Sequence, residues 1–208
     1  MNKSCEIYLV RHGETDWNAA GRIQGHTDIP LNTLSLGQAA QLGSSLAHID
    51  FSAVYSSDLS RAKETARLII GPRVLPFIET PALRERWAGS FEGQSKETLD
   101  HWTEKFFLSQ EALSQDYCLK TPWHPEIESQ ASIFKRALTF LAEQLSTYCE
   151  QTILAVTHGG VIRAFLDHLS FIPKNKWIVP NCGFIKLKLT ESALHLEEIH
   201  GIIRSHLP

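Results

Sequence analysis

The chain has 208 residues and a formal net charge of -3 at pH 7, from 20 Lys and Arg against 23 Asp and Glu. This length suits a single α/β domain over residues 1–208, and two full domains would be cramped. The faintly acidic balance argues against a nucleic-acid partner, because any basic site has to be a local pocket.

Cysteine spacing and the first residues bear on metal binding, redox chemistry and location. The four cysteines are far apart and form no C-x-x-C pair, which argues against a zinc knuckle or a dithiol redox site. The chain begins without an apolar signal region, and no apolar run approaches the roughly 20 residues that span a bilayer. We expect reduced thiols, a cytoplasmic location and no membrane partner. The oligomeric state stays open, with a homodimer as one option.

The first part of the chain alternates short apolar runs with helical patterns. Apolar, partly β-branched runs predict strands, and apolar residues recurring at three- and four-residue spacing predict helices. Asn32 is suited to cap the first helix, and Ser57 or Asp58 the second. Gly71 and Pro72 end the second helix. The expected elements are a strand at 6–10, a helix at 33–47, a strand at 53–56, a helix at 59–70 and a weaker strand at 74–79.

The second part resumes this alternation after an insertion. Residues 94–125 are helical and rich in aromatics, and we interpret them as a lid insertion. The remaining expected elements are an amphipathic helix at 129–148, a strand at 153–156, a helix at 161–168 and a hairpin of strands at 184–189 and 194–200. The whole pattern predicts a three-layer α/β fold: a mainly parallel sheet with helices on both faces and an antiparallel edge hairpin.

Two His-Gly pairs stand directly after expected strands. His12 and Gly13 follow the strand at 6–10, and His158 and Gly159 follow the strand at 153–156. Ligands of such sheets bind beyond the carboxyl ends of the strands, so both pairs are expected at the working edge. A lone His near a strand end is usually a hydrogen-bonded structural group. The repetition of the pattern favours a functional role.

Five ordered motifs together resemble the histidine phosphatase, or phosphoglycerate mutase-like, superfamily. The motifs are Arg11-His12-Gly13-Glu14-Thr15, Asn18, Ser56-Ser57-Asp58-Leu59-Ser60-Arg61-Ala62, Leu83-Arg84-Glu85 and Thr157-His158-Gly159-Gly160-Val161-Ile162-Arg163. The resemblance spans residues 6 to about 168 and is closest to the phosphatase branch, which includes α-ribazole phosphatase and broad-specificity phosphatases. Together the motifs are far more specific than any one of them.

The resemblance implies a hydrolase that acts on a phosphomonoester of a small metabolite through a phosphohistidine on His12. Glu85 would protonate the departing oxygen and then activate water, and a pKa raised by burial would suit it. A phosphoryl group carries close to two negative charges, so fixed cations and donors must surround it. The resemblance assigns catalysis to His12, Glu85 and His158, phosphate binding to Arg11, Asn18, Arg61, His158 and Gly159, and weaker substrate or lid roles to Thr15, Gln24, Gly25 and Arg86.

Several of these residues also have a plainer interpretation. Arg61 could pair at the surface with Asp58 or Glu64, as charged residues in a first helical turn often do. Glu85 has an arginine on either side and could be a simple ion-pair member. Glu14 is expected to be a structural hydrogen-bond acceptor behind the neighbouring arginine.

No metal or organic cofactor is expected. The ten histidines do not show the spacing of zinc hydrolases, and Gly159-Gly160 lacks the Lys and the Ser or Thr of a nucleotide-binding P-loop. If the chain were a mutase, 2,3-bisphosphoglycerate would serve as a primer and nothing more.

A cofactor-dependent phosphoglycerate mutase is the main alternative. The mutases of this superfamily typically carry Gly-Asn where the chain has Gly159-Gly160, and Arg-His-Tyr-Gly where it has Arg86-Trp87-Ala88-Gly89, so the phosphatase branch is favoured. Ile127 stands where many phosphatase relatives have the Gly of Gly-Glu-Ser, which is expected to add bulk near the lid and alter specificity. A non-catalytic phospholigand-binding protein is a remoter alternative, because the nucleophile and the acid are both present.

Overall fold

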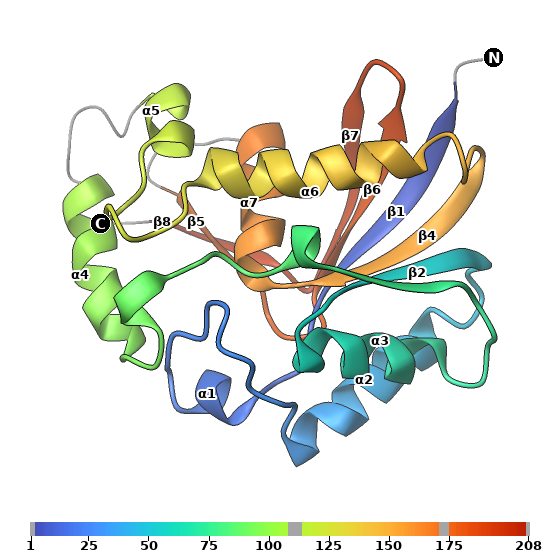
Figure 1. Cartoon of the computed structure of the whole chain (residues 1–208), viewed down its shortest axis with the longest axis horizontal. Helices are drawn as coiled ribbons and strands as arrows, with labels where there is room; N and C mark the ends of the chain where they lie inside the picture. The colour runs from blue at the N-terminus through green and yellow to red at the C-terminus, as the bar shows by residue number, and fades with distance from the viewer. Residues whose placement is uncertain (1–2, 108–113, 171–174, 207–208) are drawn as a thin grey trace.

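The core of the protein is a six-stranded sheet in the order β3-β2-β4-β1-β6-β7 (Figure 1). The structure is a computed structural model that describes residues 3–107, 114–170 and 175–206. The first four strands in that order run parallel, and β6 and β7 form an antiparallel hairpin at one edge. The strands are β1 (Ser4–Arg11), β2 (Phe51–Ser57), β3 (Phe77–Thr80), β4 (Gln151–Thr157), β6 (Phe184–Thr190) and β7 (Leu194–His200).

Helices cover both faces of this sheet (Figure 1). On one face lie α2 (Thr33–Ser45) and α3 (Ser60–Ile70), and on the other lie α6 (Gln130–Gln144) and α7 (Gly159–Leu169). Shorter elements are α1 (Asp16–Ala19) and two 3-10 turns, η1 (Pro81–Leu83) and η2 (Gly89–Phe91). The segment interpreted as a lid contains α4 (Lys96–Phe107) and α5 (Gln115–Lys120), and residues 108–113 within it lie outside the described ranges.

Side-chain alternation along β1 explains why the sheet is covered twice. Ile7 and Leu9 belong to the apolar cluster beneath α6 and α7, whereas Tyr8 and Val10 belong to the cluster beneath α2 and α3. All four are buried. Because successive side chains of a strand point to opposite faces, an apolar run with no polar break is buried on both sides. The expected three-layer α/β fold is confirmed.

Most of the expected elements are present, with two differences. Asn32 caps α2 as expected, since its side chain accepts from the Ser35 amide. The expectation that Ser57 or Asp58 caps the next helix is wrong: Leu59 is the N-cap residue of α3 and makes no side-chain cap bond. The second difference is a small antiparallel sheet of β5 (Asn175–Ile178) and β8 (Ile203–His206), which the apolar pattern did not indicate.

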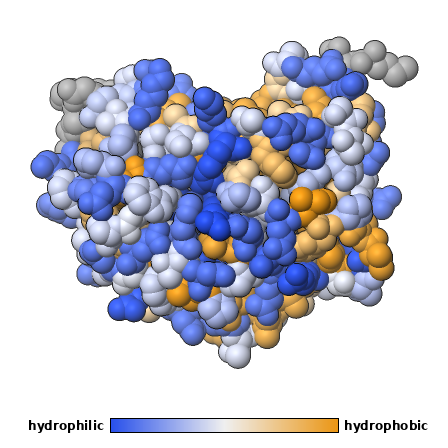
Figure 2. Space-filling model, in the orientation of Figure 1, coloured by the Kyte–Doolittle hydropathy of each residue, from blue (hydrophilic) through white to orange (hydrophobic). Residues whose placement is uncertain are grey.

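On the face seen in Figure 2, hydrophilic residues gather near the middle and hydrophobic residues gather toward the lower right. Among the helices of the described ranges, none is long and apolar enough to cross a bilayer.

Candidate active site

The carboxyl ends of β1 and β4 bring the two His-Gly pairs together. The strands pair in parallel with Arg11 opposite Thr157, so the next residue on each is a histidine at the same edge. The His12 amide donates to the Thr157 carbonyl at 2.9 Å. The His12 and His158 rings lie edge to face, with centroids 5.0 Å apart, and both residues are buried. Strand register therefore brings together two histidines that are distant in the sequence.

The protonation of His12 is set by its surroundings. Its Nδ1 lies 2.6 Å from the Gly13 carbonyl oxygen. A carbonyl can only accept, so Nδ1 carries the proton and Nε2 keeps a lone pair. Burial, followed by the charges of Arg61 and Arg11, lowers the pKa of His12 well below its ordinary value despite that hydrogen bond. His12 is therefore neutral at pH 7, as a nucleophile must be.

Two buried arginines flank the histidines. Arg61 donates to the carbonyls of Thr27 and Gly25, both at 2.8 Å, and Arg11 donates to the Val179 carbonyl at 2.6 Å. Burial lowers the pKa of each guanidinium to about 10, which leaves both charged at neutral pH. The Nε atoms of both are buried and have no hydrogen-bond partner among the described residues. Each arginine is thus anchored through its terminal nitrogens and retains an unused donor.

The surface ion pair considered for Arg61 is wrong. Arg61 has no solvent exposure. Asp58 instead forms a bidentate pair with Arg84, at 2.7 and 2.6 Å. Glu14 accepts from the Asn32 side chain at 2.8 Å and is thus a structural hydrogen-bond acceptor, as expected.

The Glu85 carboxylate is fixed by two backbone amides. Arg86 N donates to Oε1 at 2.7 Å and Gly160 N donates to Oε2 at 3.1 Å. Burial raises the pKa of Glu85, but the charge of Arg163 and these two hydrogen bonds outweigh it and hold the pKa below its usual value. The expected raised pKa is therefore wrong for the free protein, because hydrogen bonds to the charged form win over desolvation.

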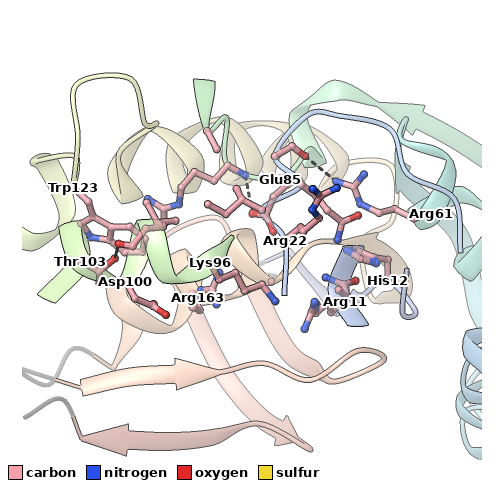
Figure 3. Close-up of a pocket in the computed structure, with 18 residues that line it drawn as sticks. Arg11, His12, Arg22, Arg61, Glu85, Lys96, Asp100, Thr103, Trp123 and Arg163 are labelled. Atoms are coloured by element: carbon pink, nitrogen blue, oxygen red, sulfur yellow. Dashed lines mark hydrogen bonds between the residues drawn. The ribbon is translucent and has the colours of Figure 1, made fainter. Parts of the chain in front are cut away.

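These groups line one elongated cavity of about 180 Å³. Figure 3 shows Arg11, His12 and Arg61 at one end, Asp100, Thr103 and Trp123 toward the other, and Glu85 between them. The described residues that line it are Arg11, His12, Asn18, Arg22, Ile23, Gln24, Gly25, Arg61, Glu85, Arg86, Ala88, Lys96, Leu99, Asp100, Thr103, Trp123, Gly159 and Arg163. Cations outnumber carboxylates on this wall, so the cavity is suited to an anion.

The other residues singled out in the sequence fall into two groups. Asn18, Gln24, Gly25, Arg86 and Gly159 line the cavity. Thr15 does not: it is buried and caps α1, where its side chain accepts from the Asn18 amide. His158 packs behind His12, and neither of its ring nitrogens has a hydrogen-bond partner among the described residues. Ile127 lies in a separate apolar cluster with Ile23, Ala88 and Phe91.

No role was predicted from the sequence for four charged residues that line the cavity. These are Arg22, Lys96, Asp100 and Arg163. Arg163 could have been found, because it follows Gly159 by four residues on α7 and so lies on the same helical face. Lys96 and Asp100 reach the cavity from α4, within the segment interpreted as a lid, and no spacing in that segment indicates which of its side chains line the cavity.

Within the part of the chain that the structure describes, no three or more His, Cys, Asp and Glu side chains are grouped so that they could hold an ion.

Comparison with known proteins identifies the family. Residues 7–200 match the model of the histidine phosphatase superfamily (branch 1). The chain belongs to this superfamily. It is 40% identical over 165 residues, 76% of its length, to a metal-independent phosphoserine phosphatase of Arabidopsis thaliana, of whose length the match spans 66%. The expected family, and the expected assignment as a histidine phosphatase, are confirmed.

Two solved structures of this superfamily are similar over almost the whole chain. One is a phosphoserine phosphatase mutant of Entamoeba histolytica in complex with phosphoserine, with a TM-score of 0.75, 26% identity and coverage of 95% of this chain and 97% of that one. The other is a phosphoglycerate mutase of Bacillus anthracis, with a TM-score of 0.79, 26% identity and coverage of 95% and 93%. The fold is thus shared by hydrolases and mutases alike.

Proposed function

We propose that this histidine phosphatase hydrolyses a small phosphomonoester whose alcohol carries a carboxylate and an ammonium group, with phosphoserine as the first candidate. The observation that carries the proposal is the single cavity in which a neutral His12, anchored arginines and the Glu85 carboxylate meet, with Lys96 and Asp100 further along the same wall. Two relatives named as phosphoserine phosphatases support the substrate.

In the first step the Nε2 lone pair of His12 attacks phosphorus, and the bond from phosphorus to the alcohol oxygen breaks. The proton stays on Nδ1 and is donated in a hydrogen bond to the Gly13 carbonyl, which stabilises the positive charge that the ring acquires. Arg11 and Arg61 line the cavity beside His12 and offer their guanidinium charge and remaining donors to the equatorial oxygens of the phosphoryl group. Asn18 is oriented for the same task, because its Oδ1 already accepts from Thr15 and leaves the amide nitrogen to donate.

Glu85 supplies the proton to the departing alcohol oxygen. Its lowered pKa in the free protein comes largely from the charge of Arg163 and from backbone amides. A bound phosphate dianion opposes the arginine charges, so the pKa of Glu85 rises when substrate binds. In the second step Glu85 takes a proton from water, which attacks the phosphohistidine, and inorganic phosphate departs. No metal takes part in either step.

The rest of the cavity, away from His12, determines which alcohol is accepted. Arg22, Lys96 and Arg163 lie between the two ends of the cavity and favour a carboxylate on the leaving group (Figure 3). Asp100 and Thr103 lie on the same wall, and Asp100 favours an ammonium group (Figure 3). Phosphoserine carries both groups, whereas 3-phosphoglycerate carries the carboxylate alone.

Gly160 favours hydrolysis over mutase chemistry. A Cβ atom at this position would lie 2.0 Å from Glu85 Oε1. The Asn that mutases of the superfamily typically carry here therefore requires another arrangement of the acid. The mutase alternative is kept as an outcome of the test.

The test compares phosphate release from phosphoserine, 3-phosphoglycerate and glycerol phosphate by the purified protein in the presence of a chelator. We expect kcat/KM to be highest for phosphoserine and unaffected by the chelator. The Asp100→Asn variant should lose about tenfold of its preference for phosphoserine over 3-phosphoglycerate, which corresponds to about 1.4 kcal/mol. Equal ratios in wild type and variant would contradict the role of Asp100.

Mutase activity is measured on the same preparation with 3-phosphoglycerate and a 2,3-bisphosphoglycerate primer. Formation of 2-phosphoglycerate faster than phosphate release would overturn the proposal in favour of a mutase. Activity lost to the chelator and restored by zinc would overturn it in favour of a metal enzyme.

A further inference from the structure

An ion pair outside the cavity is attached to the loop that carries Glu85. Arg136 on α6 and Glu128, just before that helix, form a bidentate pair with nitrogen–oxygen distances of 2.8 and 2.9 Å. Both side chains are largely buried, with 23% and 14% exposed. Neither lines the cavity that holds His12. A pair this buried is costly to form unless its remaining donors and acceptors are also used.

The remaining donors of Arg136 go to the backbone of Glu85 and of the segment just before it. Its Nη1 donates to the Ala82 carbonyl at 2.8 Å, and its Nη2 donates to the carbonyl of Glu85 itself at 3.0 Å. Glu128 binds the same loop two residues further along, at Trp87. Its amide donates to the Trp87 carbonyl at 3.0 Å, and its carboxylate accepts from the Trp87 amide at 3.3 Å. The pair therefore holds the loop from 82 to 87 against the start of α6.

The Glu85 peptide is also held from a second direction. The His26 ring nitrogen Nε2 lies 2.9 Å from the same Glu85 carbonyl oxygen. The carboxylate of Glu85 depends on this backbone, since one of its two hydrogen bonds comes from the adjacent Arg86 amide. A shift of the loop would therefore carry the carboxylate away from Gly160 and from the alcohol oxygen that it has to protonate.

We propose that Glu128 and Arg136 are positioning residues that fix the backbone of the Glu85 loop and so hold the carboxylate at the leaving group. The inference rests on the role of Glu85 in the proposed function. It explains why a Glu and an Arg eight residues apart, outside the cavity, are buried together behind the acid. They act through Glu85 and never touch the substrate.

The test uses two substrates that differ in their need for an acid. An alkyl phosphate such as phosphoserine requires protonation of its departing oxygen, whereas p-nitrophenyl phosphate releases a stable phenolate without it. We expect Arg136→Gln to lower kcat/KM on phosphoserine about 100-fold, the order of loss seen when a catalytic group is misplaced by an ångström. Its kcat/KM on p-nitrophenyl phosphate should fall far less, because kcat/KM reports the transfer to His12, before Glu85 activates the water that both substrates share. Arg136→Lys, which keeps one donor, should recover part of the loss.

A double variant separates positioning from general damage to the fold. Adding Arg136→Gln to Glu85→Gln should cost no further kcat/KM on phosphoserine, because the group being positioned is already absent. If Arg136→Gln does not fold, Glu128→Gln, which weakens the same pair without changing its size, replaces it. Glu6→Gln is the matched control, since it weakens an ion pair with Lys186 at 2.8 Å that makes no contact with the loop from 82 to 87, and it should leave kcat/KM on both substrates unchanged.

Equal losses of kcat/KM on both substrates, or an additive loss in the Glu85→Gln background, would overturn the positioning role. If Glu85→Gln alone keeps full kcat/KM on phosphoserine, the acid itself is misassigned and the positioning role fails with it. The two failures are distinguishable because only the second leaves the single Glu85 variant active.

Discussion

The second of the two glycines that follow His158 determines how closely Glu85 can approach the end of β4. Gly160 donates its amide to Glu85, and a Cβ atom there would lie 2.0 Å from the carboxylate oxygen. At Gly159 a Cβ atom would lie 3.4 Å from Arg11 Nε, a tight but tolerable contact. The glycine after the second His-Gly pair is thus required by the acid, whereas the space beside Arg11 would also admit a Cβ atom at Gly159.

Gly160→Ala should therefore damage catalysis more than folding. Two backbone amides hold the carboxylate, so the added methyl displaces it, and we expect kcat to fall about 100-fold. Gly37→Ala is the matched control, because nothing lies within 4 Å of a Cβ atom at that position inside α2. It should leave kcat unchanged and stabilise the protein by about 1 kcal/mol. Steady-state kinetics and urea unfolding of both variants measure this, and a fully active Gly160→Ala would contradict the account of the acid.

The candidate site could be predicted from the sequence to the extent that it follows strand ends. Arg11, His12 and His158 were expected together because they directly follow strands whose order could be inferred. The role of Arg61 was ambiguous between phosphate binding and a surface ion pair. Its burial depends on the carbonyls of Gly25 and Thr27, which no local pattern indicates. The lowered pKa of Glu85 was not predictable, because it depends on amides and charges from other elements.

Short local signals also account for which elements could be predicted. Long apolar runs and the cap at Asn32 indicated the main strands and α2 correctly. The sheet of β5 and β8 was missed because each strand has four residues and the two are separated in the sequence by β6 and β7. Pairing of this kind is decided by tertiary contacts and not by the strands' own composition.

The cap of α2 gives a prediction at the scale of one element. Asn32 accepts from the Ser35 amide at 3.0 Å and donates to Glu14 at 2.8 Å. Asn32→Ala removes the cap and should lower the free energy of unfolding by about 1 kcal/mol, whereas Asn32→Ser keeps a capping oxygen and should lose clearly less. Urea unfolding of both variants is the measurement. Equal loss in the two would show that the contact with Glu14, and not the cap, matters.

For the whole molecule, buried histidines make stability depend on pH. Burial lowers the pKa of His12 and His158 well below the ordinary 6.5. Below about pH 6.5 the unfolded chain therefore binds protons at these positions that the folded chain does not, and stability is lost as the pH falls. Asp167 acts in the opposite direction, since burial raises its pKa to about 6 and the folded chain keeps its proton longer than the unfolded chain does.

Burial lowers the pKa of His168 as well, so three imidazoles against one carboxyl leave a net loss of stability toward acid. We expect the free energy of unfolding to fall between pH 7 and pH 5, by about 1.4 kcal/mol per pH unit for each net proton. Asp167→Asn removes the opposing group and should make the fall steeper. Urea unfolding at pH 7, 6 and 5 measures both slopes. A free energy of unfolding that stays level or rises toward pH 5 would contradict the neutral, buried histidines.

The most direct measurement is to trap the covalent intermediate. Wild-type protein is mixed with radiolabelled phosphoserine, quenched with alkali within milliseconds and digested, since phosphohistidine survives base and is lost in acid. We expect label on the peptide that contains His12 and none in the His12→Ala variant, whose turnover should be abolished. Label on another residue, or a His12→Ala variant that keeps the wild-type rate, would contradict the transfer of the phosphoryl group through His12.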